Sequence, residues 1–136
     1  MPAQSPLQAG IIATLRGSVP GLMAIYAFGS RIRGDANTDS DLDLAVLSAG
    51  YADPLALWDL AGQLADLAHC PVDLLDLRAA STVMQYQIIT GGVCWWRADS
   101  RAALFEAAVL SEKTALDEAR AGLLSDIARE GTIYGR

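Results

Sequence analysis

Apolar residues along this chain follow two spacings in turn, and each spacing predicts a different kind of element. Three stretches place apolar residues three or four positions apart after a capping serine or aspartate, which predicts helices over 6–16, 54–68 and 82–91. Four apolar runs are short enough to be strands, over 22–28, 42–47, 71–77 and 93–96. The run from Leu22 to Phe28 has no polar alternation, so we expect a strand in the middle of a sheet.

The last predicted element is unusually long. Helical spacing continues from about Ser100 to Arg129, which corresponds to a helix of roughly 45 Å. A small domain does not need such a helix to cover its own sheet. Either it breaks into two helices near Ser111 or Gly122, or part of it packs on another chain.

The order of the elements predicts the fold class. Strands interleaved with helices indicate an α/β (α+β) domain over residues 1–136, with a mixed sheet of about four strands and helices packed on it. The chain would end in a long C-terminal helix or helix pair. Trp95 and Trp96 are neighbours on a predicted strand and should face opposite sides of it, one of them toward the core.

Composition narrows the functional classes. The 136 residues are 52% hydrophobic with a net charge of −6, which is typical of a folded domain and unlike a general polynucleotide binder. The acidity is compatible with one nucleotide held by metal ions and with a basic protein partner. No signal peptide and no membrane-spanning run is apparent, so we expect a cytoplasmic protein. His69, Cys70 and Cys94 form no metal-ligand pattern.

The candidate chemistry lies where the first strand ends and the second begins. Gly29 and Ser30 follow the strand 22–28, and the backbone N–H groups of such a turn can bind an anion. Asp41 and Asp43 are two positions apart on a strand, so their carboxylates share a face about 7 Å apart. Taken alone, the glycine–serine pair fits an ordinary turn, and the aspartate pair fits a solvent-facing strand.

A third acid changes this interpretation. Asp73 lies in the next strand, and like charges on one face repel unless a cation compensates them. Carboxylate oxygens suit Mg²⁺, and the parts suit in-line displacement at the α-phosphorus of a nucleotide. We assign Asp41 and Asp43 as ligands of Mg²⁺. Asp73 would complete the metal site and help to deprotonate the hydroxyl group that accepts the nucleotide. Asp76 should face the other side of a regular strand, although a bulge would reverse that choice.

At these residues the chain resembles a known family. Gly29-Ser30, ten residues, and then Asp41-x-Asp43 is similar to the signature of the polymerase-β-like nucleotidyltransferase superfamily. The single-domain length resembles its small branch, the minimal nucleotidyltransferases (MNT type). This resemblance implies a palm-like fold, with Gly29 and Ser30 at the triphosphate of ATP and with Arg33-Gly34 in the place of an Arg-Gly pair that the family often has. For Arg33 we predict a phosphate contact, and a contact with the incoming partner or a solvated position in the loop stay open as alternatives.

Within that branch the chain most resembles the MNT-type antitoxins that are paired with HEPN-type toxins. Val72-Asp73-Leu74 is similar to the strand that carries the family's third acid. The resemblance implies a Mg²⁺-dependent enzyme that transfers AMP from ATP to a tyrosine of the toxin ribonuclease, and a hetero-oligomer with that toxin. Two alternatives stay open: neutralisation by binding and occlusion without catalysis, and a nucleotidyltransferase acting on a small molecule of the aminoglycoside type.

Overall fold

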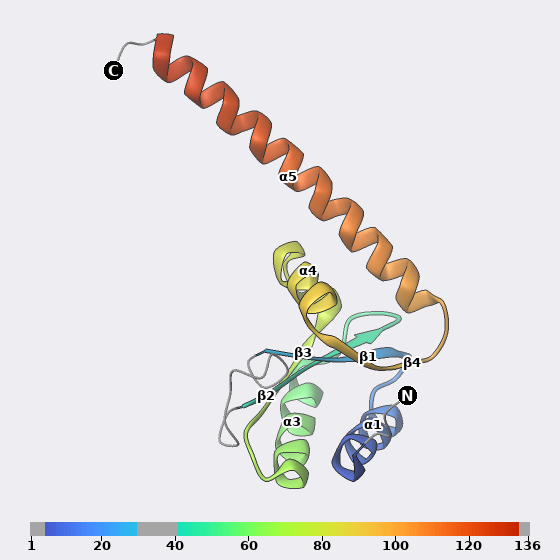
Figure 1. Ribbon diagram of the computed structural model, residues 1–136. Coiled ribbons are helices and arrows are strands. Elements are labelled where there is room, and N and C mark those ends of the chain that lie inside the picture. The colour runs from blue at the N-terminus through green and yellow to red at the C-terminus, as the bar shows by residue number, and fades with distance from the viewer. Residues whose placement is uncertain (1–4, 30–40, 134–136) are drawn as a thin grey trace.

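The computed structural model describes residues 5–29 and 41–133, with side chains up to residue 125, and the structural statements that follow concern these residues. The helices and strands predicted from the sequence are present, which confirms the fold class (Figure 1). A short 3₁₀ turn, η1, follows the third strand and was not predicted. In chain order the elements are α1 (Pro6–Ser18), β1 (Leu22–Phe28), β2 (Leu42–Ser48), α3 (Pro54–Ala68), β3 (Val72–Asp76), η1 (Leu77–Ala79), α4 (Thr82–Gly91), β4 (Val93–Arg97) and α5 (Arg101–Ile133).

The four strands form one mixed sheet in the order β3-β2-β1-β4. β1 pairs antiparallel with β2 and with β4, whereas β2 and β3 are parallel. The first six residues of β1 are buried, as expected for an inner strand that is covered on both faces. β3 and β4 form the two edges of the sheet, so one side of each is available to neighbours outside it.

Helices cover both faces of the sheet, with α1 and α3 on one side and α4 and the start of α5 on the other (Figure 1). Alternate residues of β2 sort to these two layers. Leu44 and Val46 pack with α1 and α3, whereas Ala45 and Leu47 pack with α4 and α5. Because side chains alternate along a strand, Asp43 lies on the same face as Ala45, the α4 side of the sheet.

The expectation that Trp95 and Trp96 face opposite sides was wrong. In the pairing of β1 with β4, Ile25 faces Trp96 and Tyr26 faces Cys94, which leaves Trp95 as an extra residue. Such a bulge breaks the alternation of side chains. Both tryptophans are therefore partly buried against the core cluster that α1 and α3 share.

A hydrogen-bonded group anchors the base of α5 to the sheet. The hydroxyl of Tyr26 in β1 donates to Glu106 over 2.6 Å, and Arg97 donates to the same carboxylate over 3.0 Å. Burial, followed by the hydrogen bond to Glu106, raises the pKa of Tyr26 well above its ordinary value. The neutral phenol is therefore the form that this fold stabilises.

α5 is continuous over its whole length, which excludes a break at Ser111 or Gly122. Ala102 and Val109 near its start are buried, whereas Leu123 is 60% exposed, and Figure 1 shows the helix projecting away from the sheet and its covering helices. That part of it packs on another chain stays a prediction. None of the helices within the described ranges has the length and apolar character needed to cross a membrane.

Candidate active site

The turn after β1 packs directly against one of the predicted acids. Phe28 pairs with Asp43 of β2, and Gly29 follows with a φ of +86°. A Cβ placed on Gly29 would clash with Oδ2 of Asp43 and would lie 3.1 Å from its Cγ. Only a residue without a side chain can therefore bring its backbone against this carboxylate, and glycine also tolerates the positive φ.

The sheet register places the third predicted acid beside the first. Asp43 of β2 pairs with Asp73 of β3 in the parallel ladder. Paired residues on adjacent strands are about 5 Å apart and point to the same face, so the two carboxylates are neighbours on the α4 side. Asp43 is half-buried on an inner strand, whereas Asp73 is exposed on the edge strand. One of these acids is thus held inside the fold, and the other faces an incoming molecule.

Asp41 directly precedes β2 and is exposed. Its position two residues before Asp43 agrees with a shared face. Within residues 5–29 and 41–133, however, no group of three acidic, histidine or cysteine side chains is close enough to hold a metal ion. The donor chemistry fits Mg²⁺, because carboxylate oxygens are its preferred protein ligands. The three-acid metal site stays a prediction, as do the roles of Ser30 and Arg33, which lie outside the described residues.

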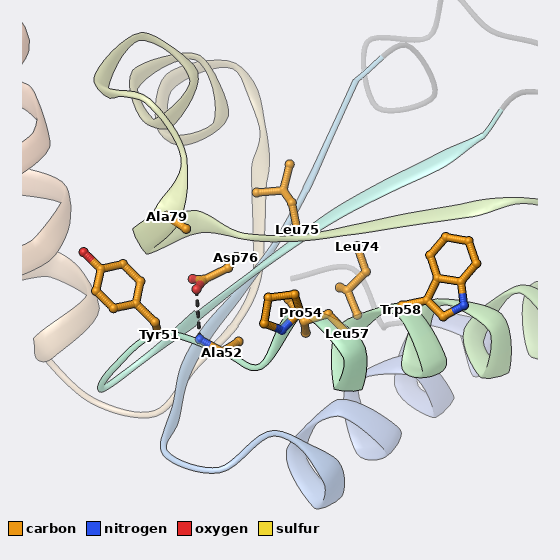
Figure 2. A pocket seen from close by; sticks show the side chains of 9 residues that line it. All are labelled: Tyr51, Ala52, Pro54, Leu57, Trp58, Leu74, Leu75, Asp76 and Ala79. Carbon is orange, nitrogen blue, oxygen red and sulfur yellow. Dashed lines mark hydrogen bonds between the residues drawn. The ribbon is translucent and has the colours of Figure 1, made fainter.

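Asp76, the alternative third acid, is hydrogen-bonded elsewhere. It pairs in register with Val46, on the face that α1 and α3 cover. Its Oδ2 accepts from the backbone N–H of Ala52 over 2.9 Å (Figure 2). Its Oδ1 accepts from the N–H of Arg78 over 3.0 Å. Both oxygens therefore organise the loop before α3 and the start of η1. This geometry favours Asp73 as the acid that accompanies Asp43.

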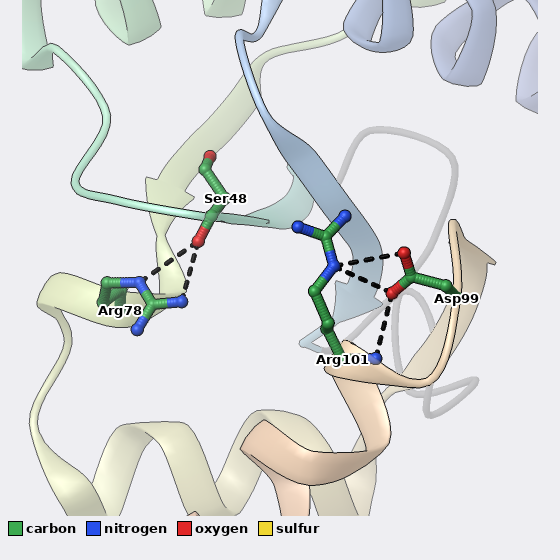
Figure 3. A network of polar contacts seen from close by, with 4 residues as sticks. All are labelled: Ser48, Arg78, Asp99 and Arg101. Atoms are coloured by element: carbon green, nitrogen blue, oxygen red, sulfur yellow. Dashed lines mark hydrogen bonds and ion pairs between the residues drawn. The ribbon is translucent and has the colours of Figure 1, made fainter.

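Arg78 fixes the far end of β2. Its guanidinium donates twice to the carbonyl oxygen of Ser48, over 3.1 and 2.8 Å (Figure 3). The guanidinium also lies over the ring of Phe105 in α5. Figure 3 also shows Asp99 paired with Arg101 where α5 begins, and the hydrogen bonds from Arg101 hold the pKa of Asp99 below its usual value. Neither pair is near Asp43 along the strands, so we interpret both as structural contacts.

Gly92 packs closely against the end of β1, which the sequence did not reveal. The sequence indicated only that this glycine ends α4. A Cβ there would lie 2.7 Å from the carbonyl oxygen of Ala27 and 2.6 Å from that of Ile88. Gly92 therefore allows α4 and β4 to approach the end of β1, next to Phe28 and Gly29. A pair of adjacent glycines at 91 and 92 was the available signal, but the sequence alone does not say which of them is confined.

Fold and site together define a nucleotidyltransferase. The chain belongs to the polymerase beta nucleotidyltransferase family, whose sequence profile matches residues 10–101. Among its relatives is the protein adenylyltransferase MntA of Shewanella oneidensis, 39% identical over 117 residues, which are 86% of this chain and 84% of MntA. The resemblance inferred from the motif spacing is thereby confirmed.

Two solved structures are similar over nearly the whole chain. One is a toxin–antitoxin complex with AMP-PNP, in which a chain matches with a TM-score of 0.78 and 38% identity, over 89% of this chain and 98% of that one. The other is the tri-AMPylated Shewanella oneidensis HEPN toxin in complex with an MNT antitoxin, with a TM-score of 0.73 and 36% identity, over 90% of this chain and 96% of that one. The resemblance to MNT antitoxins therefore extends to the fold.

Proposed function

We propose that this chain is an antitoxin that silences a HEPN-type toxin by transferring AMP from ATP to a tyrosine hydroxyl of that toxin. The relatives support this proposal, since MntA is a protein adenylyltransferase and one related complex contains an AMPylated HEPN toxin. The structural observation that carries it is the contact of the Gly29 backbone with Asp43, which has Asp73 beside it in register. The turn that we assign to phosphate thus begins beside two paired acidic residues at one end of the sheet.

The inner part of the site would bind the nucleotide. The N–H groups of the turn at Gly29 and Ser30 would hold the triphosphate, with Arg33 as a further phosphate contact. Asp41, Asp43 and Asp73 would hold Mg²⁺. When bound, that ion neutralises phosphate charge and stabilises the leaving pyrophosphate. The position of Asp43 against Gly29 supports this assignment, because it couples the metal-binding side chain to the phosphate-binding backbone.

The transfer itself is an in-line displacement. The tyrosine oxygen of the toxin forms a bond to the α-phosphorus, and the bond from that phosphorus to the oxygen bridging to the β-phosphate breaks, so pyrophosphate leaves. The hydroxyl proton passes to the carboxylate of Asp73, which is exposed on the edge strand and can meet an acceptor. Asp43, half-buried, stays with the nucleotide. Positioning and charge neutralisation therefore account for most of the catalysis.

The cellular compartment and the assembly of the enzyme follow from this proposed reaction. We place the reaction in the cytoplasm, where ATP is available and where the thiols of Cys70 and Cys94, which form no disulfide, stay reduced. We also propose that residues 1–136 act as one domain, in a hetero-oligomer with the toxin. The acceptor residue then belongs to the partner, not to this chain.

The test is to incubate the chain with ATP, Mg²⁺ and the HEPN-type toxin encoded beside it, and to measure the intact mass of the toxin. We expect increments of one or more AMP, and none with the double variant Asp41→Asn/Asp43→Asn. A folded toxin that gains no mass would refute the transfer. If the double variant still protected cells as well as the wild type, occlusion would be the mechanism instead.

A further inference from the structure

Three large apolar side chains near the start of α3 are more exposed than any others in the described part of the chain. Tyr51 is 76% exposed, Leu55 78% and Trp58 81%. They lie within eight residues of one another and contribute little to the core. Exposed apolar groups that gather in this way, unlike single scattered ones, mark an interaction site. We call these three residues, with the hollows beside Trp58, the Trp58 surface.

Two hollows lie on either side of Trp58, between α3 and the edge strand β3. The first has a volume of about 520 Å³ and extends from Trp58 past Leu74 to Tyr51, as Figure 2 shows. The second, of about 390 Å³, lies between β3 and the small residues Ala61, Gly62 and Ala65 of α3. Trp58 and Leu74 line both. The surface therefore offers a projecting aromatic ring between two apolar recesses, a shape that protein side chains can fill.

The second hollow reaches the edge strand that carries Asp73. Asp73 is among the residues that line it, and Asp73 is also the register partner of Asp43. The hollow lies on the α3 side of β3, whereas the carboxylate of Asp73 lies on the α4 side, and β3 has no further strand beyond it within the described sheet. A partner as large as a protein that occupies the Trp58 surface can therefore extend around this edge to the acid that we assign to the acceptor hydroxyl.

The charged residues near the Trp58 surface favour a basic partner over a second copy of this chain. Asp59 and Asp66 of α3 are exposed and lie three and four positions from Gly62, and Asp73 of β3 lines the second hollow. α3 and β3 carry no lysine or arginine. A second copy of this chain, with its net charge of −6, would place the same carboxylates against one another. A partner with basic residues around an apolar patch would complement both features.

We propose that the Trp58 surface is where the toxin docks to present its acceptor hydroxyl, with apolar side chains of the toxin in the two hollows and basic ones opposite the acidic rim. This inference rests on the proposed function, because it takes the toxin to be the acceptor. It adds the recognition surface, which neither the metal-binding acids nor the phosphate-binding turn supplies.

Gly62 gives the sharpest test. A Cβ at Gly62 meets no atom within 4 Å, so Gly62→Lys adds bulk and positive charge to the second hollow without disturbing the fold. Gly17→Lys is the matched control, since Gly17 is also helical, also open and outside both hollows. Trp58→Ala removes the central ring. We would measure the Kd for the purified toxin by calorimetry, the AMP increment of the toxin by intact mass, ATP binding and Tm.

We expect Gly62→Lys and Trp58→Ala each to raise the Kd for the toxin on the order of tenfold or more and to slow transfer in parallel. ATP binding and Tm should stay unchanged, and Gly17→Lys should behave as the wild type. Wild-type binding and transfer by both variants would overturn the docking proposal and leave the proposed function intact. A wild-type chain that bound toxin without transferring AMP would refute the function instead. Self-association that Gly62→Lys abolished, with toxin binding kept, would identify a second copy as the occupant.

Discussion

Replacement of Gly29 by alanine should separate catalysis from stability. The backbone φ of +86° is unfavourable for a residue with a Cβ and costs about 1–2 kcal/mol of folding free energy. In addition, the new methyl group would clash with Oδ2 of Asp43, so the carboxylate must rotate or move. A displacement of about 1 Å in a catalytic group reduces turnover on the order of 100-fold. Gly29→Ala should therefore lower Tm by roughly 3–10 °C and transfer by a much larger factor.

Gly21 provides the matched control at the other end of the same strand. Its φ is +65°, so alanine there is also strained, but its Cβ would lie 3.4 Å from the Cβ of Ala49, an ordinary contact. Gly21→Ala should lose a similar amount of stability, measured by urea unfolding, and keep its transfer rate. Single-turnover AMP transfer to the toxin, assayed well below both Tm values, compares the two variants directly.

Two results would contradict this reasoning. If both variants lost activity equally, the loss would come from weakening β1 and not from Asp43. If Gly29→Ala retained full activity with a lowered Tm, the contact between the glycine backbone and Asp43 would not matter for the reaction.

The remaining predictions concern one acid pair, one glycine pair and one tyrosine. Asp73→Asn should keep its Tm and slow AMP transfer on the order of 100-fold. Asp76→Ala should lose about 1–3 kcal/mol of stability, because two backbone donors lose their acceptor. The reverse pattern would exchange the roles of the two acids. Gly92→Ala should lower the free energy of unfolding by about 1–3 kcal/mol, since its Cβ meets two carbonyl oxygens. Gly91→Ala has open space around its Cβ and should leave that free energy unchanged or raise it by up to about 1 kcal/mol. Urea unfolding measures both. The folded state raises the pKa of Tyr26, so the contribution of this shift to stability is complete below about pH 10 and is lost as the pH rises toward the folded-state pKa. In urea unfolding from pH 8 to 11, Tyr26→Phe should therefore flatten the alkaline decline in stability.

The elements could be predicted from sequence because each carries a local signal. Ser5, Asp53 and Ser81 do cap α1, α3 and α4, and the unbroken apolar run of β1 is an inner strand. The order of strands could not be predicted in this way, since pairing depends on contacts between residues far apart in the chain. The bulge at Trp95 illustrates this limit, because it arises from the register between β1 and β4 and not from any property of the tryptophans.

The candidate site was predictable to the extent that its residues are close in sequence. The i, i+2 spacing predicts a shared face for Asp41 and Asp43 whatever the sheet topology, although β2 begins only at Leu42. Asp73 was predicted from its place on the next strand and from the family resemblance, but its position beside Asp43 depends on the parallel register of β3 with β2, which the sequence does not reveal. The constraint on Gly29 was equally hidden, because a glycine after a strand suits many turns, and only the structure places its backbone against Asp43.

The positions of the two paired acids suggest how one small sheet could serve two substrates. Asp43 is half-buried on an inner strand, held between β1 and β3, so its carboxylate can be kept in a fixed place against the turn at Gly29, which we propose to bind phosphate. Asp73 is exposed on the edge strand, where a large acceptor can approach without displacing any element of the sheet. If the two residues were exchanged between strands, the proton acceptor would be enclosed and the nucleotide contact would be open to solvent. The strand order therefore favours the nucleotide on the inner side and the protein acceptor on the β3 side, next to the Trp58 surface.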